Sequence, residues 1–145
     1  MLRTEEKILI KRSHPDAIIP TVKTSGSAGA DLYTCKTVNA RENIITEIDT
    51  GILVELPDDY CWKIYLRSGF ASQYGAYLVT SGLIDNDYRG RIIIHVKASK
   101  AFKLRKGERF AQAVLVKVPY QVFEETFGLS ETERGTNGFG STGKY

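Results

Sequence analysis

The chain has 145 residues, of which 42% are hydrophobic and 26% are charged, proportions that are typical of a globular protein and exclude an intrinsically disordered one. Its 20 basic and 17 acidic residues give a net charge of +3, too small for the dense basic surface of a typical nucleic-acid-binding domain. No apolar stretch has the length of a membrane span or the form of a signal peptide, so we expect no nucleic-acid partner, no membrane partner and a cytoplasmic or nuclear location.

Short apolar or alternating segments recur along the chain and predict β-strands. They are rich in Ile, Val and Tyr and are bounded by Gly, Pro, Asn and Asp, which is typical of a sandwich or barrel. The predicted strands are Lys7–Lys11, Asp31–Thr34, Ile44–Ile48, Gly51–Leu56, Trp62–Leu66, Arg91–Lys97, Ala113–Val118 and Gln121–Thr126. A single helical turn is expected over Ser68–Tyr74, with Ser68 as its N-terminal cap. Because no linker or repeat divides the chain, we expect one all-β domain.

The two cysteines, Cys35 and Cys61, have neither the spacing of a metal site nor the number of a disulfide framework. A bond between them is possible in principle, but a domain of this size can be stabilised by its hydrophobic core alone. We therefore expect two buried free thiols, as in a protein of a reducing compartment.

Two segments beside predicted strands carry groups that suit a ligand. Residues 82–90 read GLIDNDYRG and present Asp85 either in an ordinary hairpin turn or as a general base that activates water. Residues 66–75 read LRSGFASQYG and place Arg67 and Ser68 at the start of the helical turn, either as a capped turn or as an anion-binding pair.

The next two segments are less informative. A short basic run extends from Lys97 to Lys106, and we interpret it as a solvated face. Residues 107–112 read GERFAQ and predict a turn and the start of a strand, where Gln112 is either a donor to a ligand or a surface amide. Neither segment defines a function on its own.

The composition changes over residues 130–145, which read SETERGTNGFGSTGKY. The segment is too polar to fold alone, so it predicts either a disordered tail or an arm that becomes ordered over a ligand. Glycines let the backbone approach phosphate oxygens, hydroxyl groups donate hydrogen bonds, and an arginine binds phosphate through two N–H groups. Those residue types favour a phosphate-containing ligand if the segment is an arm.

Together these segments resemble the five ordered motifs of the trimeric deoxyuridine triphosphatases. The motifs extend across nearly the whole chain in the order AGADLYT (28–34), RSGFA (67–71), GLIDNDYRG (82–90), GERFAQ (107–112) and RGTNGFGSTG (134–143). Any one of them is a weak signal, whereas five in order are specific. The resemblance implies a distorted jelly roll of the β-clip kind over residues 1–129, and a flexible arm over residues 130–145 that closes over the active site.

The resemblance also implies an activity and an assembly. The family hydrolyses dUTP to dUMP and pyrophosphate with Mg²⁺, which keeps uracil out of DNA and supplies dUMP for dTMP synthesis. It works as a homotrimer whose active sites lie at the subunit interfaces. By its match to the third motif, Asp85 would be the general base that activates water against the α-phosphorus. Tyr88 would lie under the deoxyribose and leave no room for a 2′-hydroxyl, and the backbone of Gly82, Leu83 and Ile84 would pair with the uracil edge.

The remaining motifs imply contacts with the phosphate chain and the metal. Arg67, Ser68 and Gly69, together with Gln112, would bind the phosphates from neighbouring subunits. Asp31 of the first motif would hold Mg²⁺ through water. These roles suit phosphoryl transfer, which requires positioning and charge neutralisation more than covalent help.

The fifth motif implies contacts made by the arm. Phe139 would stack on uracil, while Arg134, Ser141 and Thr142 would reach the γ-phosphate. Gly140 would lie within the same substrate-binding segment. Each of these residues matches the motif at its position in this sequence.

The sequence departs from the family pattern at a few positions, among them Trp62, and two alternative functions remain. Trp62 stands where glycine is usual in the family, which suggests an altered subunit contact. A deoxycytidine triphosphate deaminase shares the architecture, but it needs an acid near the base, and the segment RIIIHVKASK offers none. A jelly roll that only binds a nucleotide or a protein is expected to lack Asp85 or Arg134, and both are present.

Overall fold

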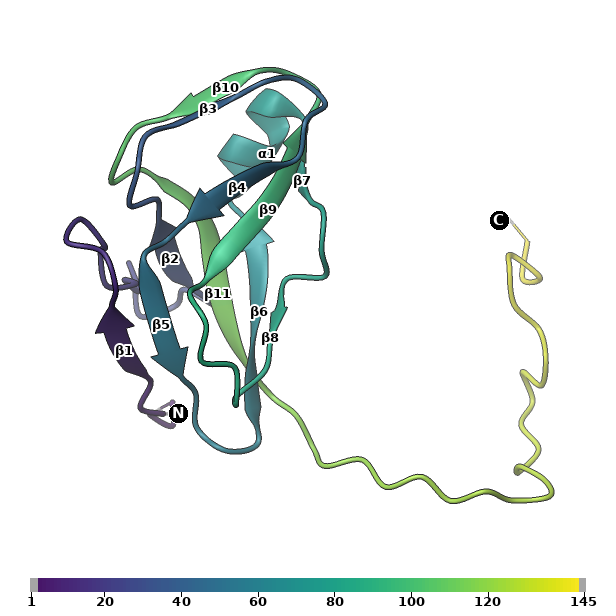
Figure 1. The fold of residues 1–145 in the computed structure, drawn as a ribbon. Coiled ribbons are helices and arrows are strands. Elements are labelled where there is room, and N and C mark those ends of the chain that lie inside the picture. The colour runs from purple at the N-terminus through teal and green to yellow at the C-terminus, as the bar shows by residue number, and fades with distance from the viewer. Residues whose placement is uncertain (1–2, 144–145) are drawn as a thin grey trace.

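The computed structural model describes residues 3–143 and is an all-β fold with one short helix (Figure 1). In chain order the elements are β1 (Leu9–Arg12), β2 (Ala30–Tyr33), β3 (Val38–Ala40), β4 (Thr46–Asp49), β5 (Ile52–Glu55), β6 (Tyr60–Leu66), α1 (Ser68–Tyr74), β7 (Ala76–Leu78), β8 (Leu83–Ile84), β9 (Ile93–Ala98), β10 (Phe102–Leu104) and β11 (Arg109–Lys117). None of the described helical residues forms a helix that is long and apolar enough to cross a membrane.

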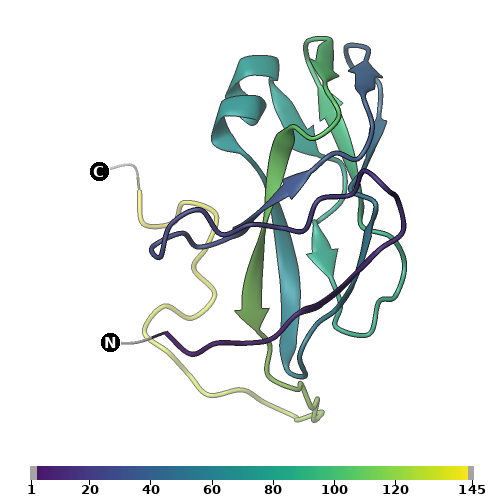
Figure 2. The same cartoon turned by 90° about the vertical axis from the view of Figure 1, so that its left-hand side faces the viewer.

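Four antiparallel sheets surround one core. The largest has the strand order β2-β11-β6-β8 and the second the order β4-β9-β7, while β1-β5 and β10-β3 form smaller pairs. Ile64 and Phe110 of the largest sheet belong to the same buried cluster as Ile48 and Val96 of the second. These two sheets therefore face each other across the core, as the side view shows (Figure 2). This arrangement confirms the predicted distorted jelly roll.

Most of the predicted strands are confirmed, with boundaries that shift by a few residues. The exception is Gln121–Thr126, where the structure has no strand. An extended segment becomes a strand only when a neighbouring strand shares its backbone hydrogen bonds, and none of the described strands pairs with residues 121–126. The strands that sequence reasoning missed, β3, β7, β8 and β10, have two or three residues each, which is too short to show an alternating pattern.

Helix α1 has the predicted bounds, but the predicted cap is wrong. Arg67 occupies the N-cap position without a side-chain cap, and Ser68 is already the first helical residue. The reason lies in the preceding strand: the N–H of Arg67 donates to the carbonyl of Phe110 at 2.9 Å, so the chain stays extended through Arg67 and then turns at once. The hydroxyl of Ser68 is consequently not used for capping.

Three residues that the sequence singled out lie in the core. Cys35 and Cys61 are buried free thiols, as predicted. Burial, followed by the nearby carboxylate of Asp49, raises the pKa of the Cys35 thiol. Trp62 is only 2% exposed and packs in the core of its own chain, which leaves little of its ring for a direct contact with another subunit.

The chain beyond β11 has a different character. Residues 118–143 form no helix or strand and lead away from the sheets (Figure 1). Several large apolar side chains in this segment are exposed: Tyr120, Val122, Phe123, Phe127, Leu129 and Phe139. The predicted arm extends to residue 145, and its last two residues lie outside the described part of the chain.

Candidate active site

A cavity of about 340 Å³ brings together residues from the first, second and fourth motifs. We call it the Asp31 cavity, and it is lined by Lys23, Ser27, Gly29, Asp31, Arg67, Ser68, Arg109 and Gln112. Four of these were predicted as site residues: Asp31, Arg67, Ser68 and Gln112. Gly69, the fifth predicted residue of this group, lines an adjacent cleft instead.

The pairing of β2 with β11 builds this cavity. Asp31 lies directly opposite Gln112 in the antiparallel register. A β-bulge between Arg109 and Ala111 interrupts the alternation of side chains, so that Arg109 and Gln112 both line the cavity. Sequence reasoning assigned no role to Arg109, which it placed in a turn before the strand predicted from Ala113, whereas β11 begins at Arg109.

The cavity has an excess of positive charge around one carboxylate. The Asp31 carboxylate is 13% exposed, and its oxygens lie 3.0 Å from Nη1 of Arg109 and 3.8 Å from Nε of Arg67. Lys23 adds a third cationic side chain to the lining. Because one carboxylate faces three cations, the Asp31 cavity suits an anionic ligand.

Gly69 stands beside the Asp31 cavity at the start of α1. A Cβ atom added to Gly69 would meet no other atom within 4 Å. Packing within the chain therefore does not require glycine at this position. The close approach of a ligand to the backbone is a physical reason for it.

A second cavity, of about 610 Å³, contains the candidate base. We call it the Asp85 cavity, and it is lined by Asp59, Tyr60, Cys61, Leu83, Asp85, Asn86, Asp87, Val118, Pro119, Tyr120 and Gln121. Asp85 is exposed and begins a β-turn in which the N–H of Tyr88 donates to its carbonyl at 3.2 Å. The flanking strands β8 and β9 belong to different sheets, so the turn is not the hairpin that the sequence suggested.

The turn after β8 is fixed by its own side chains. Nη1 of Arg89 donates to the carbonyls of Asn86 at 2.6 Å and Tyr88 at 3.2 Å. The hydroxyl of Tyr88 donates to the carbonyl of Arg91 at 3.3 Å, and its ring lies against Gly90, where any Cβ would collide with it. Tyr88 is thereby held as a half-exposed ring with a defined position.

The backbone of Gly82–Ile84 lies at a sheet edge. Gly82 has φ +72°, and an added Cβ would lie 2.7 Å from the carbonyl oxygen of Ile64, so only glycine fits. Leu83 and Ile84 pair with β6 on one side, and β8 is the last strand of its sheet. No described strand pairs with its other side, where the N–H of Leu83 donates only a long hydrogen bond, of 3.4 Å, to the hydroxyl of Ser81. A planar group that carries donors and acceptors can replace that contact.

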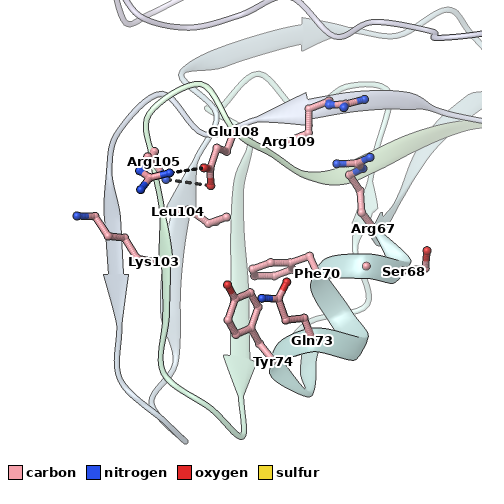
Figure 3. A pocket seen from close by; sticks show the side chains of 11 residues that line it. Arg67, Ser68, Phe70, Gln73, Tyr74, Lys103, Leu104, Arg105, Glu108 and Arg109 are labelled. Carbon is pink, nitrogen blue, oxygen red and sulfur yellow. Dashed lines mark hydrogen bonds and ion pairs between the residues drawn. The ribbon is translucent and has the colours of Figure 1, made fainter.

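A third cavity, the α1 cleft, has a volume of about 570 Å³ and adjoins the Asp31 cavity (Figure 3). Its lining consists of Arg67, Ser68, Gly69, Phe70, Gln73, Tyr74, Lys103, Leu104, Arg105, Glu108 and Arg109. Arg67, Ser68 and Arg109 line both cavities. Phe70 forms the floor of this region by packing edge-on against Phe102, with ring centroids 5.0 Å apart.

The arm carries its candidate residues on a series of turns. Nε of Arg134 donates to the carbonyl of Asn137 at 2.9 Å, and Arg134 lines one hollow together with Thr142. Phe139 is fully exposed, while Gly140 has φ +84° in the turn that follows it. Ser141 closes a further turn through its N–H, which donates to the carbonyl of Gly138 at 3.2 Å.

The predicted site residues thus form three separate groups in one copy of the chain. The Asp31 cavity and the Asp85 cavity share no lining residue, and the arm leads away from both (Figure 1). Among the described residues, no three His, Cys, Asp or Glu side chains cluster to hold a metal ion. Asp31 is therefore the single carboxylate at the cationic cavity.

Comparisons with known proteins agree with these motifs. A family model described as dUTPase matches residues 15–143. The deoxyuridine 5'-triphosphate nucleotidohydrolase of Helicobacter pylori (strain P12) is 39% identical over 140 residues, which cover 94% of this chain and 97% of the relative. The protein of the same name from Nautilia profundicola is 40% identical over 141 residues, with coverages of 95% and 99%.

The fold also matches solved structures. A structure of a mutant Staphylococcus bacteriophage 80alpha dUTPase with dUpNHpp superposes with a TM-score of 0.88 and covers 95% of this chain and 99% of the phage chain. The two sequences are 23% identical, so this match concerns the fold.

Proposed function

The chain belongs to the dUTPase family and hydrolyses dUTP, and from this premise we propose how its own residues perform the reaction. Asp85 acts as the general base: its exposed carboxylate accepts a proton from the water that attacks the α-phosphorus. The bond between the α-phosphorus and the bridging oxygen breaks, which releases dUMP and pyrophosphate. The position of Asp85 in a turn fixed by Arg89 supports this role, because a general base must be held in place.

The base and sugar bind beside the same turn. The free edge of β8 offers the backbone groups of Gly82, Leu83 and Ile84 to the uracil edge, as one strand offers its edge to another. Cytosine presents a different pattern of donors and acceptors there. The ring of Tyr88, fixed against Gly90, lies under the deoxyribose and excludes a 2′-hydroxyl.

The phosphate chain binds in the Asp31 cavity. Arg67 and Ser68 supply a guanidinium and a hydroxyl that caps no helix, while Gly69 and Gln112 supply backbone and amide donors. Such fixed donors stabilise the charge that develops on phosphate oxygens during the reaction.

Mg²⁺ would enter this cavity together with the substrate phosphates, whose negative charge offsets the three cationic side chains. The ion typically keeps several waters and is held by one or two carboxylates together with substrate phosphates, and Asp31 is the carboxylate in question. Arg109 fixes that carboxylate at 3.0 Å. When bound, the metal neutralises charge on the phosphate oxygens.

A homotrimer completes the site. Residues of the Asp31 cavity, the Asp85 cavity and the arm come from different subunits, and Arg134, Ser141 and Thr142 of the arm contact the γ-phosphate. Phe139, with Gly140 next to it, covers the uracil, which accounts for a fully exposed aromatic ring in the isolated chain. The observation that supports this proposal is that the two cavities share no lining residue in one copy of the chain while the arm leads away from both, so that neighbouring copies would bring the three groups together.

The test is incubation of the protein with dUTP, dCTP or UTP, each with Mg²⁺, followed by product analysis. We expect dUMP and pyrophosphate from dUTP, and little product from dCTP or UTP. Conversion of dCTP to dUTP would instead identify a deaminase. Unchanged dUTP would indicate a binding protein and would overturn the proposed mechanism.

A further inference from the structure

We propose that the α1 cleft binds the acidic start of the arm, Glu131 and Glu133, from another copy of the chain. This inference rests on the proposed function, in which the arm reaches the phosphate chain in the Asp31 cavity. It assigns a docking site to the part of the arm that precedes the fifth motif. The partner is therefore a second copy of this protein, recognised through charge.

The outer wall of the cleft is basic. Lys103 of β10 and Arg105 in the following loop project at its rim, on the side opposite α1 (Figure 3). Among the described residues, no carboxylate lies within 4.0 Å of the Lys103 ammonium. The Arg105 side chain is 80% exposed, and the one carboxylate that its guanidinium pairs with in the described part of the chain is that of Glu108, at 4.0 Å. At this rim Lys103 is thus available to an acidic partner, and Arg105 keeps exposed N–H groups beyond its ion pair with Glu108.

The segment that leads into the fifth motif has the opposite charge. Residues 118–133 contain four glutamates, Glu124, Glu125, Glu131 and Glu133, and no lysine or arginine. The last two are exposed. This sign of charge complements the cleft, and the attraction between them brings an otherwise unattached segment to the correct face.

The geometry of the chain places these glutamates near the cleft. The α1 cleft and the Asp31 cavity share Arg67 and Arg109, so they are immediate neighbours. An extended chain covers at most about 3.6 Å per residue, so Glu131 lies within roughly 11 Å of Arg134. When Arg134 contacts the phosphates in the Asp31 cavity, Glu131 and Glu133 are within reach of the neighbouring rim.

The course of the arm favours another copy as its source. The arm leaves β11 at Lys117, at the end of the molecule opposite α1, and leads away from its own body (Figure 1). Its apolar side chains, including Phe123 and Phe127, are exposed and do not pack against the core of their own chain, so a neighbouring copy can cover them. A docked acidic segment then holds the glycine-rich end over the site of a neighbouring subunit.

Charge reversal tests the pairing. The double variant Lys103→Glu/Arg105→Glu is expected to lower kcat/KM for dUTP about three- to tenfold, since exposed ion pairs are individually weak. Adding Glu131→Lys and Glu133→Lys to the same chain should restore most of the loss. The deficit should also shrink in 0.5 M NaCl, where exposed charges are screened over a few ångströms.

Two controls separate this pairing from a general effect of charge. Lys7→Glu/Arg12→Glu changes the net charge equally at the exposed β1 edge and should leave kcat/KM unchanged. In a chain that lacks residues 130–145, reversal of the cleft should have no further effect. An equal loss in that truncated chain, or a failure of the arm reversal to restore activity, would overturn the inference and show that the cleft acts on the phosphates directly.

Cross-linking tests whether the pairing joins two copies. The variant Lys103→Cys/Glu131→Cys is treated with a short bismaleimide, and the parent chain, whose Cys35 and Cys61 are buried, serves as the control. We expect covalent dimers and trimers under denaturing conditions. Cross-links only within one chain, or none, would overturn the inference even if the parent protein hydrolyses dUTP, so its failure differs from failure of the proposed function.

Discussion

Asp85 combines exposure with a fixed backbone. The turn it begins is held by its carbonyl oxygen and by Arg89, not by its carboxylate, so the carboxylate can change without altering the turn. Asp87 lines the same cavity and provides a matched comparison.

We predict that Asp85→Asn lowers kcat by at least about two orders of magnitude, the effect of losing a general base. Affinity for a non-hydrolysable dUTP analogue should change little, which calorimetry can measure. Asp87→Asn should keep most of the activity. Normal turnover by Asp85→Asn would exclude the proposed role.

Gly82 and Gly69 are expected to be required for different reasons, Gly82 for the fold and Gly69 for ligand binding. Gly82→Ala forces a Cβ to within 2.7 Å of the Ile64 carbonyl at a positive φ, so we expect a loss of about 1–3 kcal/mol in the free energy of unfolding. Gly69→Ala meets open space and should not lower stability, yet it should weaken binding of the dUTP analogue. Urea unfolding and calorimetry on both variants measure the contrast. Equal stability of the two variants would contradict it.

At the scale of elements, the sequence predicts the longer strands and the helix because their apolar patterns and turn residues extend over several positions. It fails where structure depends on partners. β8 has only two residues and is a strand because it pairs with β6. Residues 121–126 have the sequence pattern of a strand but no neighbouring strand to pair with. The sequence predicts Ser68 as the N-cap because serine is a common capping residue. The residue at that position is Arg67, which is held extended by a hydrogen bond to Phe110 that the sequence does not reveal.

The same limit applies to the site. The motifs indicated Asp31, Arg67, Ser68 and Gln112, and the structure gathers them in one cavity. Arg109 was not predicted as a site residue because a β-bulge directs its side chain toward that cavity, and no residue in this segment indicates a bulge. A sequence motif therefore identifies candidate site residues more reliably than it predicts the direction in which the backbone orients their side chains.

The arm is the element whose removal is most informative. We predict that deleting residues 130–145 lowers kcat/KM for dUTP by about one to two orders of magnitude, because the proposed contacts from Arg134 to phosphate would be charge-assisted hydrogen bonds. The melting temperature should remain nearly unchanged, since the arm leads away from the core (Figure 1). Activity assays and thermal denaturation of the same preparation measure both. Full activity in the truncated chain would show that the segment is only a tail.

At the scale of the whole molecule, a site divided between copies has a clear signature. Asp85→Asn and Arg67→Ala are each expected to be inactive. When the two are unfolded and refolded together, about a quarter of the sites receive both intact residues from different subunits, and activity should return to that extent.

Mixing the two variants after separate refolding is the control, and it should give no activity until subunits exchange. A chain that carries both substitutions should also stay inactive. If refolding the two variants together restores nothing, Asp85 and Arg67 act within one chain and the trimeric site is wrong.

The brevity of β8 has a consequence for solubility. A sheet edge of the kind proposed to pair with a nucleobase can also accept a strand from another protein chain, which is how edge-to-edge aggregation begins. With only two residues, β8 offers too few hydrogen bonds to retain such a strand, while a single flat ring needs no more. The edge is therefore long enough for one small molecule and too short to act as a template for polymerisation.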